Sequence, residues 1–370
     1  MTAKDATDIQ PVTFPPEVLA RIAPDISLQR HLSLGLRPSL RKYEEFREYH
    51  STPLTNDCNE NPTGAPILGG NISKIGNMFV ITTITGGIVE ELVPVSGELE
   101  DLSNSNQSTD SGYAPVWPQV EVERGRVGAP TDEEMIVSEK LYETILSSQV
   151  IPNASLEVDV GVGYQDGTIS YTDETMKPKN RKWTYVLYAK QQVFSRSGPI
   201  FDLLWNSLML ALQNVKLPRV YIDERATDLK IPIRTRGRSA SIRETYDLMF
   251  DSQTLVDLKI INDNVSFASN FGVIALDPSL EIKVDEEEDQ DEDMDKTLDT
   301  ALAAKKPVLL ADLQDDTEEG AVLSKMSISA TADGTYKSLY LASADTRIPL
   351  VHLQTALKLS VQRSKDLSQL

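Results

Sequence analysis

The chain has few of the residues on which disulfide, redox and metal chemistry depends. Its 370 residues include one cysteine, Cys58, and three widely separated histidines, His31, His50 and His352. A single cysteine excludes an internal disulfide and is typical of a protein from a reducing compartment. One cysteine and three scattered histidines make no recognisable zinc site, so we expect neither a metal nor a cofactor.

Long apolar runs are also missing. No stretch reaches the roughly eighteen consecutive apolar residues that a membrane-spanning helix needs. The N-terminal sequence MTAKDATDIQPVTF lacks the basic and apolar regions of a signal peptide. These features predict a soluble, intracellular protein. Its 40% apolar content is sufficient for one large folded domain or two modest ones.

Sequence motifs for nucleotide, hydrolase and metalloprotease chemistry are absent too. There is no P-loop, no Gly-x-Ser-x-Gly nucleophile turn and no His-Glu-x-x-His helix. We interpret the glycine pairs at 69–70 and 86–87 as turns rather than as cradles for phosphate. Composition alone therefore leads no further than a protein with both helices and strands and no assigned chemistry.

Positive charge is in deficit and unevenly placed. The chain has 36 Lys and Arg against 56 Asp and Glu, a formal net charge of −20. Such a balance argues against non-specific binding of nucleic acid over the whole surface. Residues 285–295 contain nine acids, whereas residues 216–243 contain eight Lys and Arg. We interpret the acidic run as a solvated loop and leave open whether it recruits a cofactor.

The most apolar part of the chain, residues 183–223, predicts a strand, a helix and a second strand. WTYVLYAKQQVFS is rich in aromatic and β-branched residues, as a strand packed on a core is. Ser197 is the predicted N-cap of the helix, and Pro199 suits its first turn. Residues 200–212 are apolar almost all round, which is typical of a helix buried on several sides.

Other local patterns extend this interpretation. A tight hairpin turn is predicted at Gly76-Asn77. Thr131 with Glu134 forms a capping box for a helix that extends to about residue 147. The apolar residues of this helix recur at helical spacing: Met135, Ile136, Leu141, Ile145 and Leu146. Helices are also expected at 17–22, 27–34 and 349–367, and residues 37–50 are interpreted as a charged, exposed segment. Strands and helices alternate without long βαβ regularity, which predicts the α+β class.

Several stretches of the chain resemble the ribonuclease PH-like ring subunits of the eukaryotic RNA exosome, of fungal type. They are EVLARIAPDISLQRHLSLGLRPSLRKYEEFRE, ITGGIVEE, VEVERGRVGA, FDLLWNSLMLALQNVKLPR and IRTRGRSASIRE. The resemblance covers nearly the whole chain and is weakest at 51–68, 94–116 and 285–306. It implies the ribonuclease PH fold, in which two βαβα-like halves of the ribosomal protein S5 domain 2 type share one domain. We therefore expect an N-terminal arm at 1–30 and a single domain at 31–370, with a flexible insertion at 94–116 and an acidic loop at 285–306.

The resemblance also implies partners and a cellular location. It suggests heterodimers within a six-membered ring of related subunits, with S1-domain cap proteins above and RNA passing through the channel toward associated hydrolytic exoribonucleases. A subunit of this kind takes part in rRNA processing and RNA degradation in the nucleus, nucleolus and cytoplasm, without contact to a membrane.

Active relatives carry two aspartates six positions apart, where an acid or a metal assists departure of the leaving group. The resemblance aligns Glu319 and Lys325 with them. A lysine cannot coordinate magnesium or serve as a carboxylate acid or base. The alignment needs a one-residue insertion, so Asp315 or Asp316 is an alternative at the first position, but no aspartate lies near 325.

A second departure from active relatives lies at the start of the central helix. They carry a Gly-Gly-Thr-Arg run, which lets phosphate reach backbone N–H groups, where this chain has Phe201 to Trp205. We expect Phe201 and Trp205 to fill that space and Asp202 to repel the anion. The helix that begins TDEE at 131–134 also opens with acids. These differences predict no catalytic residues, a degenerate site at Asp202, Trp205, Glu319 and Lys325, and a structural role.

Two alternatives from other functional classes remain open at this point. One is a phosphate-dependent 3′–5′ exoribonuclease that uses Glu319 with a neighbouring group, and the other is a free RNA-binding module, which the net charge disfavours. Candidates for RNA or interface contact are Arg124, Arg126, Arg234, Arg236 and Arg238, because guanidinium groups offer forked donors to phosphate. Pairing with acids of a neighbouring subunit, or plain solvation, accounts for these arginines equally well.

Overall fold

The structure is a computed structural model that describes residues 14–54, 67–92, 115–125, 128–164, 168–172, 181–230, 243–277, 306–343 and 348–369. Nearly all of the predicted insertion at 94–116 and of the predicted acidic loop at 285–306 lies outside these residues. The domain division expected from the sequence stays a prediction. Its boundary at residue 30 falls inside a helix, as shown below.

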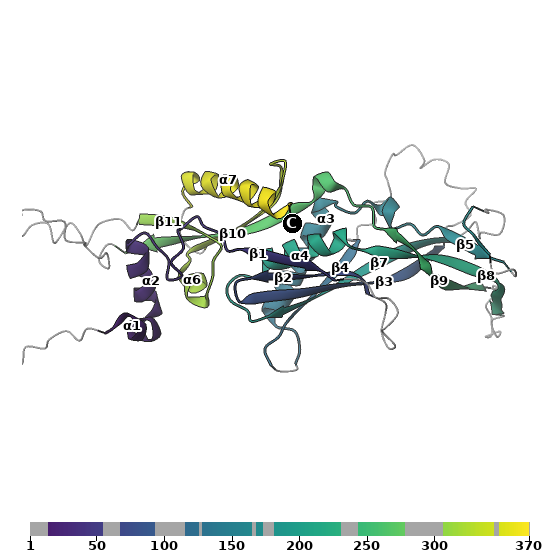
Figure 1. The fold of residues 1–370 in the computed structure, drawn as a ribbon, viewed down its shortest axis with the longest axis horizontal. Helices are drawn as coiled ribbons and strands as arrows, with labels where there is room; N and C mark the ends of the chain where they lie inside the picture. Colours follow the sequence, from purple (N-terminus) through teal and green to yellow (C-terminus); the bar gives the residue numbers. More distant parts are fainter. Residues whose placement is uncertain are drawn as a thin grey trace, which may run out of the picture.

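The strands of the described chain form three β-sheets (Figure 1). The first has the order β1 (Tyr49–Pro53), β2 (Ile67–Ile75), β3 (Met78–Leu92), β7 (Arg181–Phe194), β4 (Val116–Val122). The second has the order β11 (Lys306–Ala311), β10 (Ser266–Leu276), β12 (Ser324–Thr331), β13 (Tyr336–Ser343). The third has the order β6 (Ile169–Ser170), β5 (Val160–Gly163), β8 (Lys216–Lys230), β9 (Arg243–Asp257). Neighbours are antiparallel except for the parallel pairs β4–β7 and β5–β8.

The helices lie between and around these sheets. They are α1 (Pro16–Ile22), α2 (Pro24–Ser33), α3 (Asp132–Ser148), α4 (Phe201–Gln213), α6 (Asp316–Ala321) and α7 (Leu350–Leu367), with short 3-10 turns at Asn153–Ser155 and Asn262–Asn264. In Figure 1 α1 and α2 lie at one end of the long axis, and β8 and β9 lie at the other.

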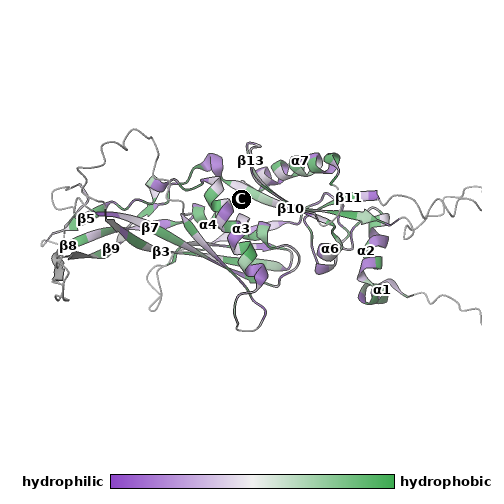
Figure 2. Cartoon of the chain, turned by 180° about the vertical axis from the view of Figure 1, so that it is seen from behind, coloured by the Kyte–Doolittle hydropathy of each residue, from purple (hydrophilic) through white to green (hydrophobic). Residues whose placement is uncertain are grey.

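The central helix α4 lies between the first and second sheets. It packs on β2 and β3 on one side and on β10 on the other, and twelve of its thirteen residues are buried. Figure 2 shows hydrophobic residues along α4 and on the strands around it. Each fully buried leucine or phenylalanine in such a helix contributes roughly 1.5–3 kcal/mol. The predicted strand–helix–strand unit is confirmed, with its two strands observed as β7 and β8.

The predicted N-cap of α4 is wrong. Ile200 holds the N-cap position and makes no side-chain capping bond. The Ser197 hydroxyl instead donates to Asp315 Oδ1 at 3.1 Å. Between them Gly198 adopts φ +82°, and a Cβ there would lie 2.8 Å from the carbonyl oxygen of Leu313. The chain therefore enters α4 through a turn that is pressed against the loop before α6.

The capping box of α3 is confirmed, but its predicted buried face is only partly right. Thr131 N donates to Glu134 Oε2 at 2.6 Å, and Glu134 N donates to Thr131 Oγ1 at 3.5 Å. Val137, Leu141 and Ile145 are buried, whereas Met135, Ile136 and Leu146 are exposed. Glu134 is buried in their place because its carboxylate also accepts from Val122 N at 2.8 Å.

Two local interpretations of glycines have opposite outcomes. The hairpin turn at Gly76-Asn77 is confirmed between β2 and β3, with Gly76 at φ +57°. The glycine pairs 69–70 and 86–87 are not turns, because they lie inside β2 and β3. At Gly69 an added Cβ would lie 2.9 Å from Val215 Cα, so the missing side chain lets the segment after α4 pack closely on β2.

The N-terminal helices differ in how far they join the core. α1 has no buried residue, whereas Leu28 and Leu32 of α2 are buried in a cluster with Ile274 and Leu310. Residue 30 therefore lies within a helix that is packed on the domain. An arm that ends there would divide this helix.

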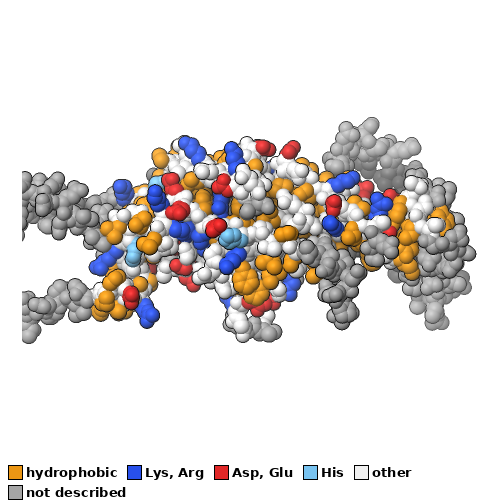
Figure 3. All heavy atoms as spheres, viewed as in Figure 1, with side chains coloured by type: hydrophobic (Ala, Val, Ile, Leu, Met, Phe, Trp, Pro, Cys, Tyr) orange, Lys and Arg blue, Asp and Glu red, His pale blue; other side chains and the backbone are white. Residues whose placement is uncertain are grey.

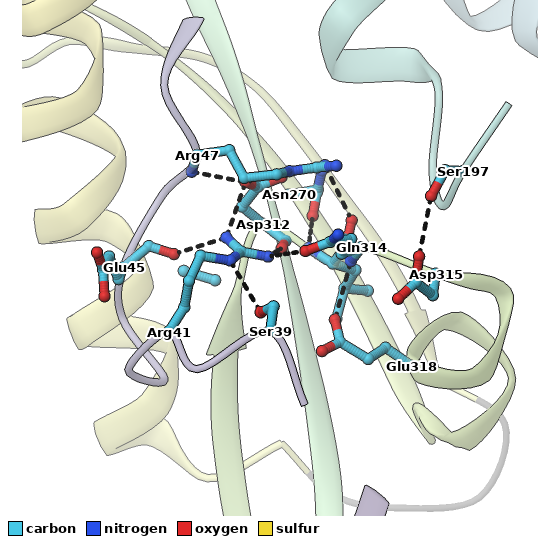
Figure 4. Close-up of polar contacts among 12 residues, drawn as sticks. Ser39, Arg41, Glu45, Arg47, Ser197, Asn270, Asp312, Gln314, Asp315 and Glu318 are labelled. Atoms are coloured by element: carbon cyan, nitrogen blue, oxygen red, sulfur yellow. Dashed lines mark hydrogen bonds and ion pairs between the residues drawn. The ribbon is translucent and has the colours of Figure 1, made fainter. Parts of the chain in front are cut away.

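The segment at 37–50 is only in part the exposed, charged stretch that its sequence predicts: Lys42, Glu44, Glu45 and Glu48 are exposed, but several arginines are not. Arg37 is 0% exposed and donates to the carbonyl oxygen of Asp312 in the loop between β11 and α6. Arg47 binds the carboxylate of the same Asp312 (Figure 4). Arg37 pairs with Glu318 of α6 and also donates to the carbonyl oxygens of Ala311 at 2.5 Å and Asp312 at 2.8 Å. Through Arg37, the segment therefore ties α6 to the end of β11.

Candidate functional site

The two residues that the resemblance aligned with catalytic aspartates are joined directly. Lys325 of β12 places its Nζ 2.9 Å from Oε1 of Glu319 in α6. Glu319 is the less exposed partner, with 20% of its side chain accessible against 44% for Lys325. The ammonium group of Lys325 therefore occupies one side of the carboxylate that the alignment places at the first aspartate position.

Arg196, which the sequence interpretation did not single out, completes the surroundings of Glu319. Its guanidinium donates to Glu133 Oε1 at 2.8 Å, to Asp316 Oδ1 at 2.8 Å and to Glu319 Oε2 at 3.1 Å. Burial alone would lower the pKa of Arg196, but its hydrogen bond to Glu133 and the charges of the three acids outweigh burial and raise it. Arg196 lies in the turn before α4 and thus links the start of α3 to α6.

Asp202 lies in the first turn of α4 and faces the same strand as this network. Its side chain is buried, with the residue 5% exposed, and its Oδ1 accepts from Ser327 Oγ at 2.5 Å. Ser327 follows Lys325 by two residues on β12, so both point from the same side of the strand. Burial raises the pKa of Asp202 to about 6. The structure therefore brings Asp202, Glu319 and Lys325 to one side of β12.

Trp205 does not belong to this group. Its indole is 0% exposed and donates from Nε1 to the carbonyl oxygen of Ser266 on β10 at 2.8 Å. Asn206 beside it is bonded to Ala268 of the same strand, donating to its carbonyl oxygen at 3.0 Å and accepting from its N–H at 2.7 Å. Trp205 is thus a core residue that fixes α4 on β10, and the expectation that it fills a space open to phosphate in active relatives stays a prediction.

Arg124 is bonded within its own chain. It lies just after β4 and donates to Glu133 Oε2 at 2.8 Å, with 35% of its side chain exposed. Arg126, Arg234, Arg236 and Arg238 lie outside the described residues. Of the predicted contact arginines, the structure thus places only Arg124, at the edge of the Arg196 network.

Charge in this region is balanced internally. Arg124, Arg196 and Lys325 face Glu133, Asp316 and Glu319, each cation within ion-pair distance of at least one of the acids. Paired carboxylates are poor partners for a divalent cation, which needs several free oxygen ligands. Within the described residues, no group of three His, Cys, Asp or Glu side chains is arranged to hold a metal ion.

A second, buried network supports α6 from the opposite side (Figure 4). Arg47 donates to both carboxylate oxygens of Asp312, at 2.8 and 2.7 Å, and Arg41 donates to Asp312 Oδ2 at 3.1 Å. Burial would raise the pKa of Asp312, but the hydrogen bonds and charge of Arg47, together with Arg41, lower it. With Arg37 bound to Glu318, this network fixes the loop before α6 and the helix α6 that carries Glu319.

Charged groups elsewhere on the visible surface are mixed in sign. On the face drawn in Figure 3, basic side chains of the described residues stand among acidic ones, with hydrophobic groups between them. None of the described helices is long and apolar enough to cross a membrane.

Comparisons with known proteins agree with this geometry. Residues 68–218 match the 3′ exoribonuclease family, domain 1, also called RNase PH. The chain is 25% identical over 265 residues to the exosome complex component rrp43 of Schizosaccharomyces pombe. The aligned stretch covers 69% of this chain and 81% of that protein.

Solved structures share the fold at low sequence identity. The Archaeoglobus fulgidus exosome with RNA bound to its active site includes a chain with a TM-score of 0.53 and 11% identity, covering 95% of this chain and 98% of its own. An archaeal exosome core gives a TM-score of 0.53 and 12% identity, covering 96% and 98%. The fold expected from the sequence is confirmed: this chain has the ribonuclease PH fold, which it shares with the archaeal exosome chains, and its residues 68–218 match the 3′ exoribonuclease family.

Proposed function

We propose that this chain is a non-catalytic subunit of an RNA exosome core ring. In this role it closes the ring and helps to guide RNA through the central channel toward an associated nuclease. The similarity to the S. pombe exosome component and the shared fold of archaeal exosome chains support membership of such a ring.

The observation that carries the non-catalytic part is the ion pair between Lys325 and Glu319. Phosphorolysis needs a free anion site for inorganic phosphate and a carboxylate available as an acid or as a metal ligand. Here the carboxylate of Glu319 is held by Lys325 and Arg196, and Arg196 is itself occupied by three acids. Neither requirement is met by this set of contacts.

The RNA-guiding role is assigned to five arginines. Arg124 has partial exposure beside Glu133. We include Arg126, Arg234, Arg236 and Arg238 on the basis of their sequence alone. Guanidinium groups that neutralise phosphates release counterions, so contacts of this kind give salt-dependent RNA affinity. A ring partner of the ribonuclease PH type, S1-domain caps and an associated hydrolytic exoribonuclease complete the proposed assembly, in nucleus, nucleolus and cytoplasm.

The test is co-expression with a ribonuclease PH-like ring subunit, followed by size measurement of the purified pair. A stoichiometric complex supports the ring role. A chain that remains monomeric in the presence of such partners contradicts it. The alternative function, a phosphate-dependent 3′–5′ exoribonuclease, predicts release of nucleoside diphosphates from RNA when phosphate is added to the pair.

A further inference from the structure

A groove of about 750 Å³ runs between β4 and α3, outside the network around Glu319. One wall follows β4 from Trp117 to Arg124, and the other follows α3 at positions three or four residues apart. Such spacing places side chains on one face of a helix. The helix α3 starts beside the C-terminal end of β4 and runs back toward the N-terminal end of that strand. The groove therefore follows the whole of β4. A strand of seven residues spans roughly 23 Å.

The outer edge of β4 is closed to strand addition. β4 is the last strand of the first sheet, and the unpaired N–H groups of an edge strand can normally bond to an added strand. Here Val120 N donates to Ser138 Oγ at 3.3 Å and Val122 N donates to Glu134 Oε1 at 2.8 Å. Pro118, the preceding residue with the same orientation, has no N–H. These backbone donors of β4 are therefore not available to an occupant, and we infer that it binds mainly through side chains.

Aromatic residues form a platform at the start of the groove. The rings of Trp117 and Tyr142 meet edge to face, with centroids 5.1 Å apart and an interplanar angle of 63°. Trp117 is nevertheless 57% exposed, and Met135 on the same helix is 52% exposed. An exposed tryptophan held by a second ring is the kind of anchor that dominates protein interfaces.

The groove is acidic. Its lining contains four glutamates and two cations, and Glu121 is paired with one of the cations, Lys190, at 3.0 Å. The other cation, Arg124, is paired with Glu133. Glu123 and Glu139 are exposed and have no ion pair among the described residues. This charge disfavours a nucleic-acid backbone and favours lysine or arginine.

We propose that this groove binds an extended, basic segment of a partner protein. The segment places an apolar side chain on the Trp117–Tyr142 platform and lysine or arginine beside Glu139 and Glu123. About six or seven extended residues match the length of β4. This site does not depend on the proposed ring function, because the residues that carry it, Trp117, Glu123, Glu139 and Tyr142, have no part in that proposal; Arg124 alone belongs to both regions.

The experiment uses the full chain and a fluorescein-labelled peptide of nine residues in which lysines alternate with leucine and proline. We expect saturable binding by fluorescence anisotropy at about 150 mM salt. Trp117→Ala and Glu139→Lys should each weaken it at least tenfold. Leu350→Ala, which removes another exposed apolar side chain on α7, should leave it unchanged. Circular dichroism confirms that each variant is folded, and Trp117→Phe should retain part of the affinity.

Three outcomes would overturn the proposal. They are the absence of saturable binding, equal affinity for a matched peptide with glutamate in place of lysine, and binding that neither Trp117→Ala nor Glu139→Lys changes. Displacement of the peptide by a short oligouridine would show that the groove takes RNA instead, and this would also contradict it.

Discussion

Lys325 Nζ lies 2.9 Å from Glu319 Oε1, across the short distance between β12 and α6. The resemblance to ribonuclease PH-like proteins aligns these two residues with a pair of aspartates, which would repel each other unless protonated or bound to a cation. In this chain the ammonium group of Lys325 stands where active relatives have the second carboxylate. The local charge is thereby satisfied without phosphate or metal, and α6 is tied to the sheet.

Removing Arg37 is predicted to destabilise the protein strongly, because its side chain forms a fully buried ion pair. Arg37→Ala leaves Glu318 buried without its partner, and losing one member of a buried pair costs about 3–5 kcal/mol. Urea unfolding of the purified protein measures this as a lower midpoint with an unchanged slope. The matched control is Arg124→Ala, whose exposed pair with Glu133 is expected to contribute no more than about 1 kcal/mol. Equal midpoints for the two variants would contradict the assignment.

Asp202 should make the protein less stable as the pH rises. Its pKa is raised from 3.8 to about 6 by burial. Below about pH 4 the carboxyl is protonated in both folded and unfolded states and contributes nothing. Between about pH 4 and 6 the unfolded state releases its proton first, so the free energy of unfolding falls by about 3 kcal/mol and stays lower above pH 6.

Asp202→Asn tests this dependence. The difference in stability between the variant and the natural protein should shift in favour of the variant between pH 4 and 7, as measured by denaturant unfolding at each pH. Glu139→Gln, on the exposed face of α3, is the control and should show no such shift. A constant difference across the range would show that Asp202 is ionised in the folded protein.

Gly198 should not tolerate a side chain. Gly198→Ala combines a positive φ of +82° with a Cβ 2.8 Å from the Leu313 carbonyl oxygen, and we expect a loss of roughly 1–3 kcal/mol. Gly87→Ala is the matched control, because nothing lies within 4 Å of its added Cβ. Thermal unfolding compares the two. A Gly198→Ala protein as stable as the control would mean that the turn before α4 is not pressed against the loop before α6.

Much of the fold follows from patterns within short stretches of sequence. The apolar run of α4, the capping box at Thr131 and the Gly76 turn depend on neighbours a few residues away, and all three are confirmed. The burial of Arg37 was not predictable in this way, because its partner Glu318 is 281 positions along the chain. A segment rich in arginine and glutamate has the composition of an exposed surface unless its distant partners are known.

The candidate site was predictable only in part, for a similar reason. The six-residue spacing of Glu319 and Lys325 carried the alignment with the family, and the two residues do meet. Arg196 was missed because it lies in a turn without a recognisable motif. Its three acidic partners lie on two other elements that are distant in the sequence. Trp205 was included because it falls near the start of α4, and the structure shows its indole bonded to β10.

The arginines at 234, 236 and 238 provide a test of the channel role. Reversing all three to glutamate in an assembled ring should lower RNA affinity and flatten its dependence on salt concentration, because phosphate contacts are lost. Lys74→Glu, an exposed charge on β2, is the control for a change in net charge. RNA protection by the triple variant that equals that of the control would remove these residues from the proposed path.

The most direct test of the central claim is a phosphorolysis assay on this chain purified with a ribonuclease PH-like partner that is itself inactive. RNA of defined length is incubated with and without inorganic phosphate, and nucleoside diphosphates are quantified. We predict no phosphate-dependent product, for the natural chain and for Glu319→Gln alike. Diphosphate release that requires phosphate and disappears in Glu319→Gln would show that the pair of Lys325 and Glu319 is a working catalytic site.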